Sequence, residues 1–214
     1  MVIVELGIIA ASLQAAGYFF YGARMLRRDI LPNPTSWLMF AYGTTLILIL
    51  EWDRDASLAL LILPATCAIS SIVVALYALR GARSWLPEHP FDRFSFAFDI
   101  LLTLVYLFTW FLLVNGFIVE TQKNLADIII LVSWNIDISA FFPLLRQVYR
   151  HPHTEHAMPW IVWTGAYSVL VLATVIETGI FNELILYPFI NMIIHGSIAI
   201  RVGLWHWMRS QPII

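Results

Sequence analysis

Seven apolar stretches, each long enough or nearly long enough to cross a lipid bilayer, constrain this chain more than any other feature. A helix needs about 20 mostly apolar residues to cross about 30 Å of hydrocarbon. Because lipid offers backbone groups no hydrogen-bond partner, each stretch is predicted to be an α-helix. We therefore predict an all-α integral membrane protein of seven transmembrane helices. They are Val4–Met25, Thr35–Leu50, Ser57–Leu79, Phe94–Phe117, Leu125–Tyr149, Met158–Ile176 and Glu183–Met208.

The composition supports a membrane protein and excludes several other classes. The chain is 60% hydrophobic and 12% charged, whereas soluble domains are about 45–50% apolar and about 25% charged. Its net charge of -2 and the lack of a concentrated basic face indicate no nucleic-acid partner. The single cysteine excludes a disulfide within the chain. No Lys or Arg precedes the first apolar run, so we expect a retained helix rather than a cleaved signal.

The basic residues are distributed unevenly between the predicted loops. Only Arg54 and Lys123 fall on one side of the membrane. Basic residues mark the cytoplasmic side, which predicts an external N-terminus and a cytoplasmic C-terminus in the cell (inner) membrane. The other side collects Arg24, Arg27, Arg28, Arg80, Arg83, Arg93, Arg146, Arg150, Arg201 and Arg209.

The first three helices resemble the last three, which indicates an internal repeat. Both triplets begin outside, so the repeats are predicted to be parallel, related by an axis along the membrane normal. This gives a 3+1+3 arrangement: a first triplet in residues 1–84, a linker helix in 85–121 and a second triplet in 122–214. The aligned pairs are Phe19 with Phe142, Arg27 with Arg150, Trp37 with Trp160, Phe40 with Trp163 and Pro64 with Pro188.

The helix–loop–helix junctions carry a resemblance to a known family. In the second repeat, Phe142–Arg150 leads through a polar loop to Met158–Trp160. In the first, Tyr18–Arg24 leads through a basic loop to Pro34–Trp37. With the 3+1+3 arrangement, these junctions resemble the SWEET sugar transporters and the wider PQ-loop (MtN3-like) superfamily, of which the chain would be a divergent bacterial-type member. The signature proline-glutamine pair itself is absent.

The resemblance implies a carrier that moves a small polar solute, sugar or amino-acid-like, by alternating access. Asn191 and Trp52 look like two of the four residues of the family's sugar pocket. The repeat partner of Asn191 is Cys67, and that of Trp52 is the apolar Val175 or Ile176. Pro143 would serve as a hinge, and Trp52 would close the site from outside.

Polar side chains at membrane depth are costly and tend to face a bundle interior. Gln14 on the first helix and Asn135 and Asp137 on the fifth lie at corresponding depths, and Asn191 and His195 share one face of the seventh. These five are predicted to line the solute site. Asp137 facing His195 would form a proton relay, although proton coupling stays open. The alternative is that the same groups only join helices by hydrogen bonds.

Several further functions can be weighed on residue patterns. The loop segment from His151 to His156 holds three His and a Glu, but H-x-H-x-x-H matches no catalytic zinc spacing, so no metal and no cofactor are predicted. Trp37 and Trp160 are expected to anchor the inner membrane interface. An intramembrane hydrolase would need converging Asp and His groups that the first three helices lack, so no enzyme is predicted. A non-transporting scaffold, receptor or complex subunit remains the alternative, and a homo-oligomer stays open.

Overall fold

The computed structural model describes residues 2–81, 87, 89–136 and 138–210. Over these residues the chain is helical, with no strand. The elements are α1 (Val2–Leu26), α2 (Pro34–Asp53), α3 (Leu58–Arg80), α4 (Pro90–Val114), α5 (Glu120–Ile136), η1 (Ser139–Phe141), α6 (Phe142–Arg150), η2 (Pro152–Thr154), α7 (Ala157–Thr178), η3 (Glu183–Ile185) and α8 (Leu186–Ser210).

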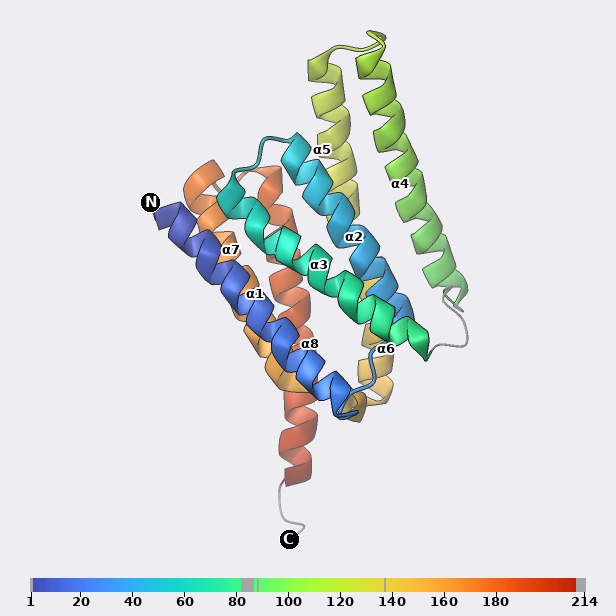
Figure 1. Cartoon of the computed structure of the whole chain (residues 1–214), viewed down its shortest axis with the longest axis vertical. Coiled ribbons are helices and arrows are strands. Elements are labelled where there is room, and N and C mark those ends of the chain that lie inside the picture. The colour runs from blue at the N-terminus through green and yellow to red at the C-terminus, as the bar shows by residue number, and fades with distance from the viewer. Residues whose placement is uncertain (1, 82–86, 88, 137, 211–214) are drawn as a thin grey trace.

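Six helical runs are long and apolar enough to span a membrane: α1, α3, α4, the run from α5 to α6, α7, and the run from η3 to α8. These runs give the chain the character of an integral membrane protein. Apolar side chains such as Leu104, Phe108 and Phe111 on α4 are exposed, as expected for a helix that faces lipid. α2 has 20 residues and is not among the six. It lies along α3 over most of its length (Figure 1).

The prediction of one continuous helix over Leu125–Tyr149 was wrong. α5 ends at Ile136, the short 3₁₀ turn η1 follows, and α6 begins at Phe142 with Pro143 in its first turn. A proline has no N–H to donate and its ring collides with the carbonyl four residues earlier, so Pro143 favours a break in the turn before it, although α3 continues past Pro64. The predicted hinge residue therefore sits next to the break.

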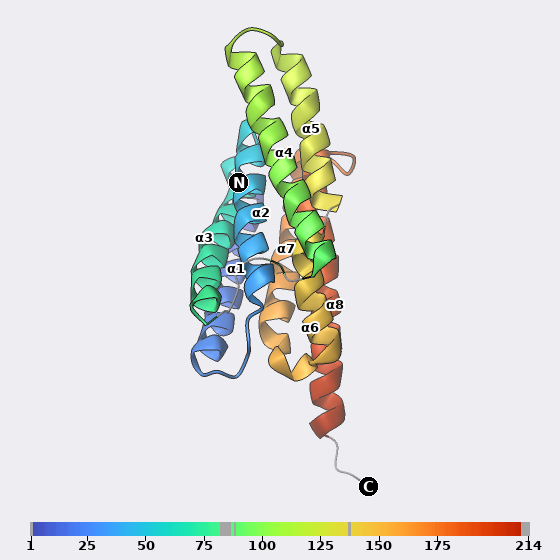
Figure 2. The same cartoon turned by 90° about the vertical axis from the view of Figure 1, so that its right-hand side faces the viewer.

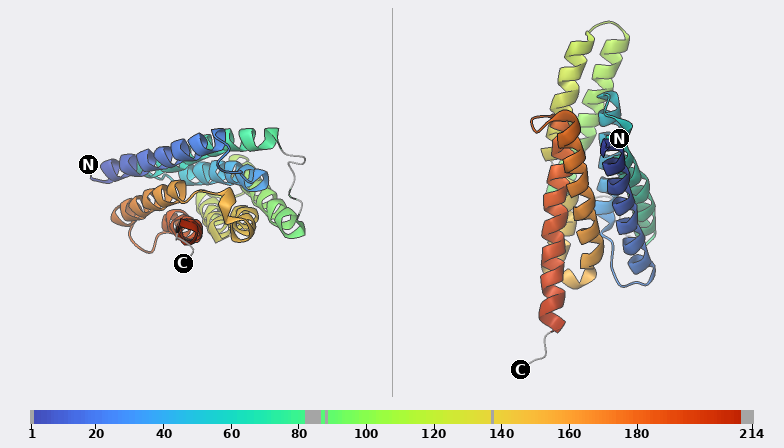
Figure 3. Two further views of the ribbon diagram at one scale, coloured as in Figure 1. Left: turned by 90° about the horizontal axis from the view of Figure 1, so that it is seen from below. Right: turned by 90° about the vertical axis from the view of Figure 1, so that its left-hand side faces the viewer.

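The helices form two layers, seen end-on in Figure 3. In the first layer α3 lies between α1 and α2, and in the second α8 lies between α7 and the α5–α6 run. α1 packs along α7, while α2 faces α5, η1 and α6. α4 packs mainly on α5, and the two helices extend together beyond the rest of the bundle (Figure 2).

The connections between the long helices lie at two opposite ends of the bundle. The α1–α2 and α6–α7 connections and the last turn of α8 lie at the end that we call the arginine-rich end (Figure 1). It carries Arg24, Arg27, Arg28, Arg150 and Arg209. The α2–α3 and α7–α8 connections lie at the opposite end, near Arg54 and Lys123. Arg83 lies outside the described residues.

Two glycines of α1 allow the neighbouring helices α3 and α7 to pack closely against it, one on each buried side. A Cβ at Gly7 would lie 2.3 Å from the backbone oxygen of Ala59 in α3, and a Cβ at Gly17 would lie 2.3 Å from Nε1 of Trp163 in α7. Since real side-chain contacts are far longer, any larger residue would force the helices apart. Gly7 therefore sets the spacing within the first layer, and Gly17 sets the spacing between the layers.

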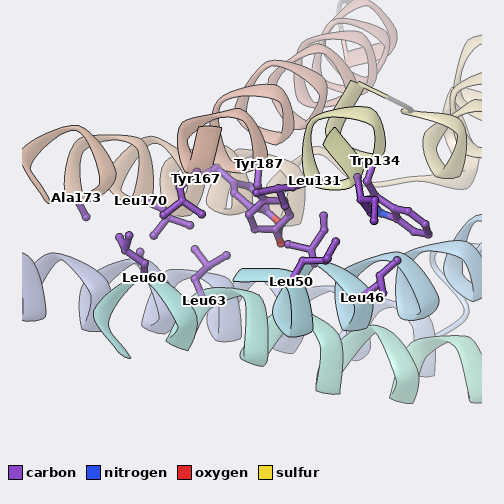
Figure 4. Close-up of a cluster of buried hydrophobic side chains, with 14 of the residues drawn as sticks. Leu46, Leu50, Leu60, Leu63, Leu131, Trp134, Tyr167, Leu170, Ala173 and Tyr187 are labelled. Atoms are coloured by element: carbon purple, nitrogen blue, oxygen red, sulfur yellow. Dashed lines mark hydrogen bonds between the residues drawn. The ribbon is translucent and has the colours of Figure 1, made fainter. Parts of the chain in front are cut away.

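Buried side chains from both layers meet along their interface. Figure 4 shows Leu50, Leu60 and Leu63 of the first layer facing Tyr167 and Leu170 of the second. A second cluster nearer the arginine-rich end combines Tyr21, Met25 and Trp37 with Leu144, Val148, Trp160 and Trp163. The interface between the layers therefore holds much of the core.

Gly7→Ala is expected to lower the melting temperature of the purified protein in detergent. The added methyl group meets backbone rather than a mobile side chain, and overpacking of this kind costs about 1–3 kcal/mol. Gly22→Ala on the same helix is the matched control, because its Cβ would meet nothing within 4 Å. Equal melting temperatures for the two variants would contradict the close packing of α1 on α3.

Candidate functional site

A cavity of about 20 Å³ lies at the interface between the two layers. Three predicted site residues line it: Cys67 on α3, and Asn191 and His195 on α8. A second cavity of about 60 Å³ adjoins it through Phe40, Thr44, Phe141 and Asn191, and a fourth predicted residue, Asn135 on α5, lines this one. The structure thus brings together Cys67, Asn135, Asn191 and His195 from helices far apart in the sequence. We call the two spaces together the central cavity.

Three polar side chains of the central cavity bond to their own helices. Asn191 donates to the carbonyl oxygen of Tyr187 at 2.9 Å, and His195 Nδ1 contacts the carbonyl oxygen of Asn191 at 2.7 Å. Asn135 donates to the carbonyl oxygen of Leu131 at 2.9 Å. Because each of these three bonds stays within one helix, it does not join the layers.

A row of hydroxyl and thiol groups crosses the interface along the wall of the central cavity. The Tyr18 hydroxyl is 2.6 Å from Ser71 Oγ and 3.2 Å from Cys67 Sγ. Cys67 Sγ is 3.7 Å from the Tyr167 hydroxyl, which is 3.1 Å from the Tyr187 hydroxyl. We call Ser71, Tyr18, Cys67, Tyr167 and Tyr187 the hydroxyl row. Its step from Cys67 to Tyr167 passes from one layer to the other.

The remaining predicted site residues lie elsewhere. Gln14 is buried and its amide faces the Tyr167 hydroxyl without good hydrogen-bond geometry. Trp52 is 69% exposed and lines a separate apolar groove of about 550 Å³ between α2, α3 and α4. Asp137 lies outside the described residues, so its contact with His195 stays a prediction.

Aromatic rings surround the central cavity. Trp37 and Trp160, which the repeat aligns, are 2% and 1% exposed and both contact the Tyr21 ring. Their predicted role as anchors at the membrane interface was therefore wrong, because both indoles are buried between the layers. His195 lies with its ring 5.2 Å from that of Trp160 and 4.9 Å from that of Tyr167. Any solute in the cavity would meet aromatic faces as well as polar groups.

The layers are joined by polar contacts at the arginine-rich end. Glu155, before α7, accepts hydrogen bonds from the Tyr21 hydroxyl of α1 and from Trp160 Nε1, both at 3.1 Å. The backbone N–H of Leu31 donates to the carbonyl oxygen of Thr154 at 2.9 Å, and Asn33 Nδ2 donates to Gln147 Oε1 at 2.9 Å. We call this set the arginine-end contacts. It closes the interface on this side of the cavity.

A second set joins the layers at the opposite end. Arg54, after α2, pairs with Glu183 of η3 at 2.5 Å. Ser57 Oγ, before α3, donates to Glu177 Oε2 of α7 at 2.9 Å. We call these the opposite-end contacts. The central cavity therefore lies between two sets of polar contacts, each of which links the first layer to the second.

A buried charge cluster links α2 to α4 and α5, and sequence reasoning missed it. Lys123 pairs with Asp127 at 2.5 Å and also with Asp53, which accepts a hydrogen bond from the Tyr106 hydroxyl at 3.0 Å. Lys123 is 3% exposed and Asp127 is fully buried. The apolar run predicted a fifth helix that begins at Leu125, which put Lys123 in the loop before it. The spacing of four between a Lys and an Asp was the available signal.

The histidine-rich loop forms no metal centre in the part of the chain that the structure describes, where no group of three or more His, Cys, Asp or Glu side chains is close enough to hold an ion. His156 instead caps α7 by accepting from the N–H of Met158. Burial, together with the charge of Arg24, lowers the pKa of His156. This loop is therefore better explained as a helix start.

Lys123→Met should destabilise the protein by about 3–5 kcal/mol, because it leaves the buried Asp127 without a counter-charge. The double variant Lys123→Met/Asp127→Leu should recover much of this loss. Arg24→Met is the control: both members of the Arg24–Asp29 pair are 41% exposed, so at most about 1 kcal/mol is expected. Denaturation in detergent measures all three. Equal loss for Lys123→Met and Arg24→Met would contradict the assigned cluster.

Stability should fall as pH rises through the range in which Glu155 loses its proton. Burial raises the pKa of Glu155 from 4.5 to about 8, against the lowering effect of the hydrogen bonds from Trp160 and Tyr21. Between these values the folded state holds a proton that the unfolded chain has released, so its stability declines from about pH 4.5 to about pH 8. In Glu155→Gln this part of the decline should be absent. Parallel melting-temperature curves for the two proteins between pH 5 and 8 would refute it.

Nothing matched the chain in comparisons with protein-family models, with curated proteins and with solved structures. The resemblance to the SWEET and PQ-loop proteins therefore stays a prediction from the sequence. The structure adds a central cavity between two layers of helices, closed at both ends by contacts that join the layers.

Proposed function

We propose that the chain is a membrane carrier that moves a small polar solute through the central cavity by alternating access. One observation carries the proposal: polar side chains from both layers meet in a buried cavity, and separate contacts between the layers close it at each end. Opening one set of contacts while the other stays closed would expose the cavity to one side of the membrane at a time. Such rocking between two bundles is a known way to transport solutes.

The proposed carrier has seven spanning helices in two parallel triplets. α1, α2 and α3 form the first, the α5–α6 run, α7 and α8 form the second, and α4 joins them. The matching order of helices supports this, since the third helix lies between the other two in both layers. α2 would be the seventh span. With the basic residues gathered at the arginine-rich end, that end is proposed to face the cytoplasm and the N-terminus to lie outside.

The proposed solute is small and polar, sugar or amino-acid-like. The described cavity residues that offer hydrogen bonds are uncharged side chains or histidine, among them Thr44, Cys67, Ser71, Asn135, Asn191 and His195. The rings of Trp163 and Tyr167 would provide stacking faces. The cavity has room for only a few water molecules. A solute would therefore need the layers to separate at one end before it binds.

The dense aromatic packing around the cavity favours a second candidate, a non-transporting scaffold or receptor. Tyr18, Trp37, Trp160 and Trp163 contact one another through their rings. In such a protein these rings would serve as a rigid core, and the cavity would never open. Measured movement of a solute separates the two candidates.

Uptake into liposomes that contain the purified protein tests the carrier. The probes are a panel of radiolabelled neutral sugars and neutral amino acids. Asn191→Leu should lower the uptake of the transported probe about tenfold, since removing a half-buried hydrogen-bonding group from the cavity wall costs roughly 1–3 kcal/mol. Asn115→Leu is the control, because Asn115 makes the same bond to the carbonyl four residues earlier but lies exposed after α4.

Two results would count against the carrier. One is that no probe enters liposomes with the wild-type protein faster than empty liposomes. The other is that Asn191→Leu and Asn115→Leu transport every probe equally well.

A further inference from the structure

One buried carboxyl group remains outside the contacts described so far. Glu51, in the last turn of α2, is 4% exposed. It borders a cavity of about 10 Å³ between the layers, near the opposite-end contacts. The other lining residues are Ala56, Leu60, Leu170, Thr174, Leu184 and Pro188. Among them only Thr174 has a polar side chain, and its hydroxyl donates to the carbonyl oxygen of Leu170.

No described group makes a hydrogen bond or an ion pair with the Glu51 carboxyl. The charged neighbours on its own helix and after it are already paired, Asp53 with Lys123 and Arg54 with Glu183. Glu177 of α7 accepts from Ser57. The titratable group of α8 that faces Glu51 is the Tyr187 phenol, which lies close enough to interact with its charge. α3 presents only apolar side chains to this cavity.

An unpaired carboxylate is costly in such a place. Burying a charge without a partner costs far more than burying a neutral carboxyl group, so the closed interface favours the form that carries a proton. When the opposite-end contacts open, water reaches the group and stabilises the charged form. Proton binding at Glu51 is thereby tied to whether the layers are closed over it.

The hydroxyl row runs from Tyr187, which lies close enough to interact with the charge of Glu51, to the central cavity. From Tyr187 it passes through Tyr167 to Cys67, which lines the cavity with Asn191 and His195. Tyr167 and Tyr187 are 1% exposed. The row therefore provides a buried polar connection in an otherwise apolar part of the interface.

We propose that Glu51 is a proton-binding site of this protein, and that its proton is carried together with the solute. The proposal rests on the proposed carrier function and adds its coupling ion. It differs from the relay between Asp137 and His195 that the sequence suggested. Protonated Glu51 permits the layers to close at the opposite end, and its deprotonation holds that end open.

Glu51→Gln tests the site because the amide keeps the size and neutrality of the protonated carboxyl group. Glu120→Gln is the control, because Glu120 is an exposed carboxyl group in the first turn of α5 that takes part in neither set of end contacts. The first readout is infrared difference spectroscopy of the reconstituted protein between acidic and alkaline buffer. Protonated Glu155 should give a C=O band in all three proteins. We expect a further C=O band in the wild type and in Glu120→Gln that is lost in Glu51→Gln. Identical bands in all three proteins would overturn the proposal.

The second readout is uptake of the transported probe into liposomes with an alkaline interior. The gradient should accelerate uptake in the wild type and in Glu120→Gln, and this acceleration should be lost in Glu51→Gln. A wild type that transports without responding to the gradient, or a Glu51→Gln variant that responds fully, would overturn the coupling and leave the carrier standing. If the wild type moves no probe but its infrared band depends on Glu51, the proton site stands and the carrier fails.

Discussion

The packing of α1 against α7 is the contact on which the rest of the structure depends. It brings the first layer onto the second, and it is close because Gly17 leaves space for the Trp163 indole. Trp163 Nε1 also donates to the backbone oxygen of Gln14 at 3.2 Å. Within hydrocarbon, helices associate through such close packing and through buried polar contacts. The central cavity, the hydroxyl row and both sets of end contacts all lie in the interface that this contact creates.

Polar groups at the ends of this interface, such as Glu155 with Tyr21 and Arg54 with Glu183, bond from one layer to the other. Around the cavity, Asn191 and His195 bond within their own helix, whereas Cys67 contacts the Tyr167 hydroxyl of the other layer at 3.7 Å. If the layers separate at alternate ends, the end contacts must break and re-form while the bonds within the helices keep the cavity walls in shape. Glu51 lies near the opposite-end contacts. Closing that end of the interface therefore removes its carboxyl group from water.

The helices and part of the site could be predicted from the sequence, whereas the helix ends could not. Apolar runs marked the helices because lipid-facing positions need apolar side chains, and Cys67, Asn191 and His195 met because polar groups turn away from lipid. Trp52 was placed in the site by resemblance, and it lies in another groove. Glu51 was missed because the second helix was ended at Leu50. It lies four residues after Ile47, a position that faces the same interface. Packing of this kind depends on contacts between the two layers, so the local pattern of apolar and polar residues does not predict it.

Distances between spin labels at the two ends of the interface test the central claim most directly. Asp55 and Phe181 are exposed at the opposite end, and Arg28 and His153 are exposed at the arginine-rich end. In liposomes, the account predicts two distance populations for each pair, with a change of pH or addition of the transported probe shifting the two pairs in opposite directions. A single narrow distribution at both ends under every condition would show that the layers do not separate, and would contradict alternating access.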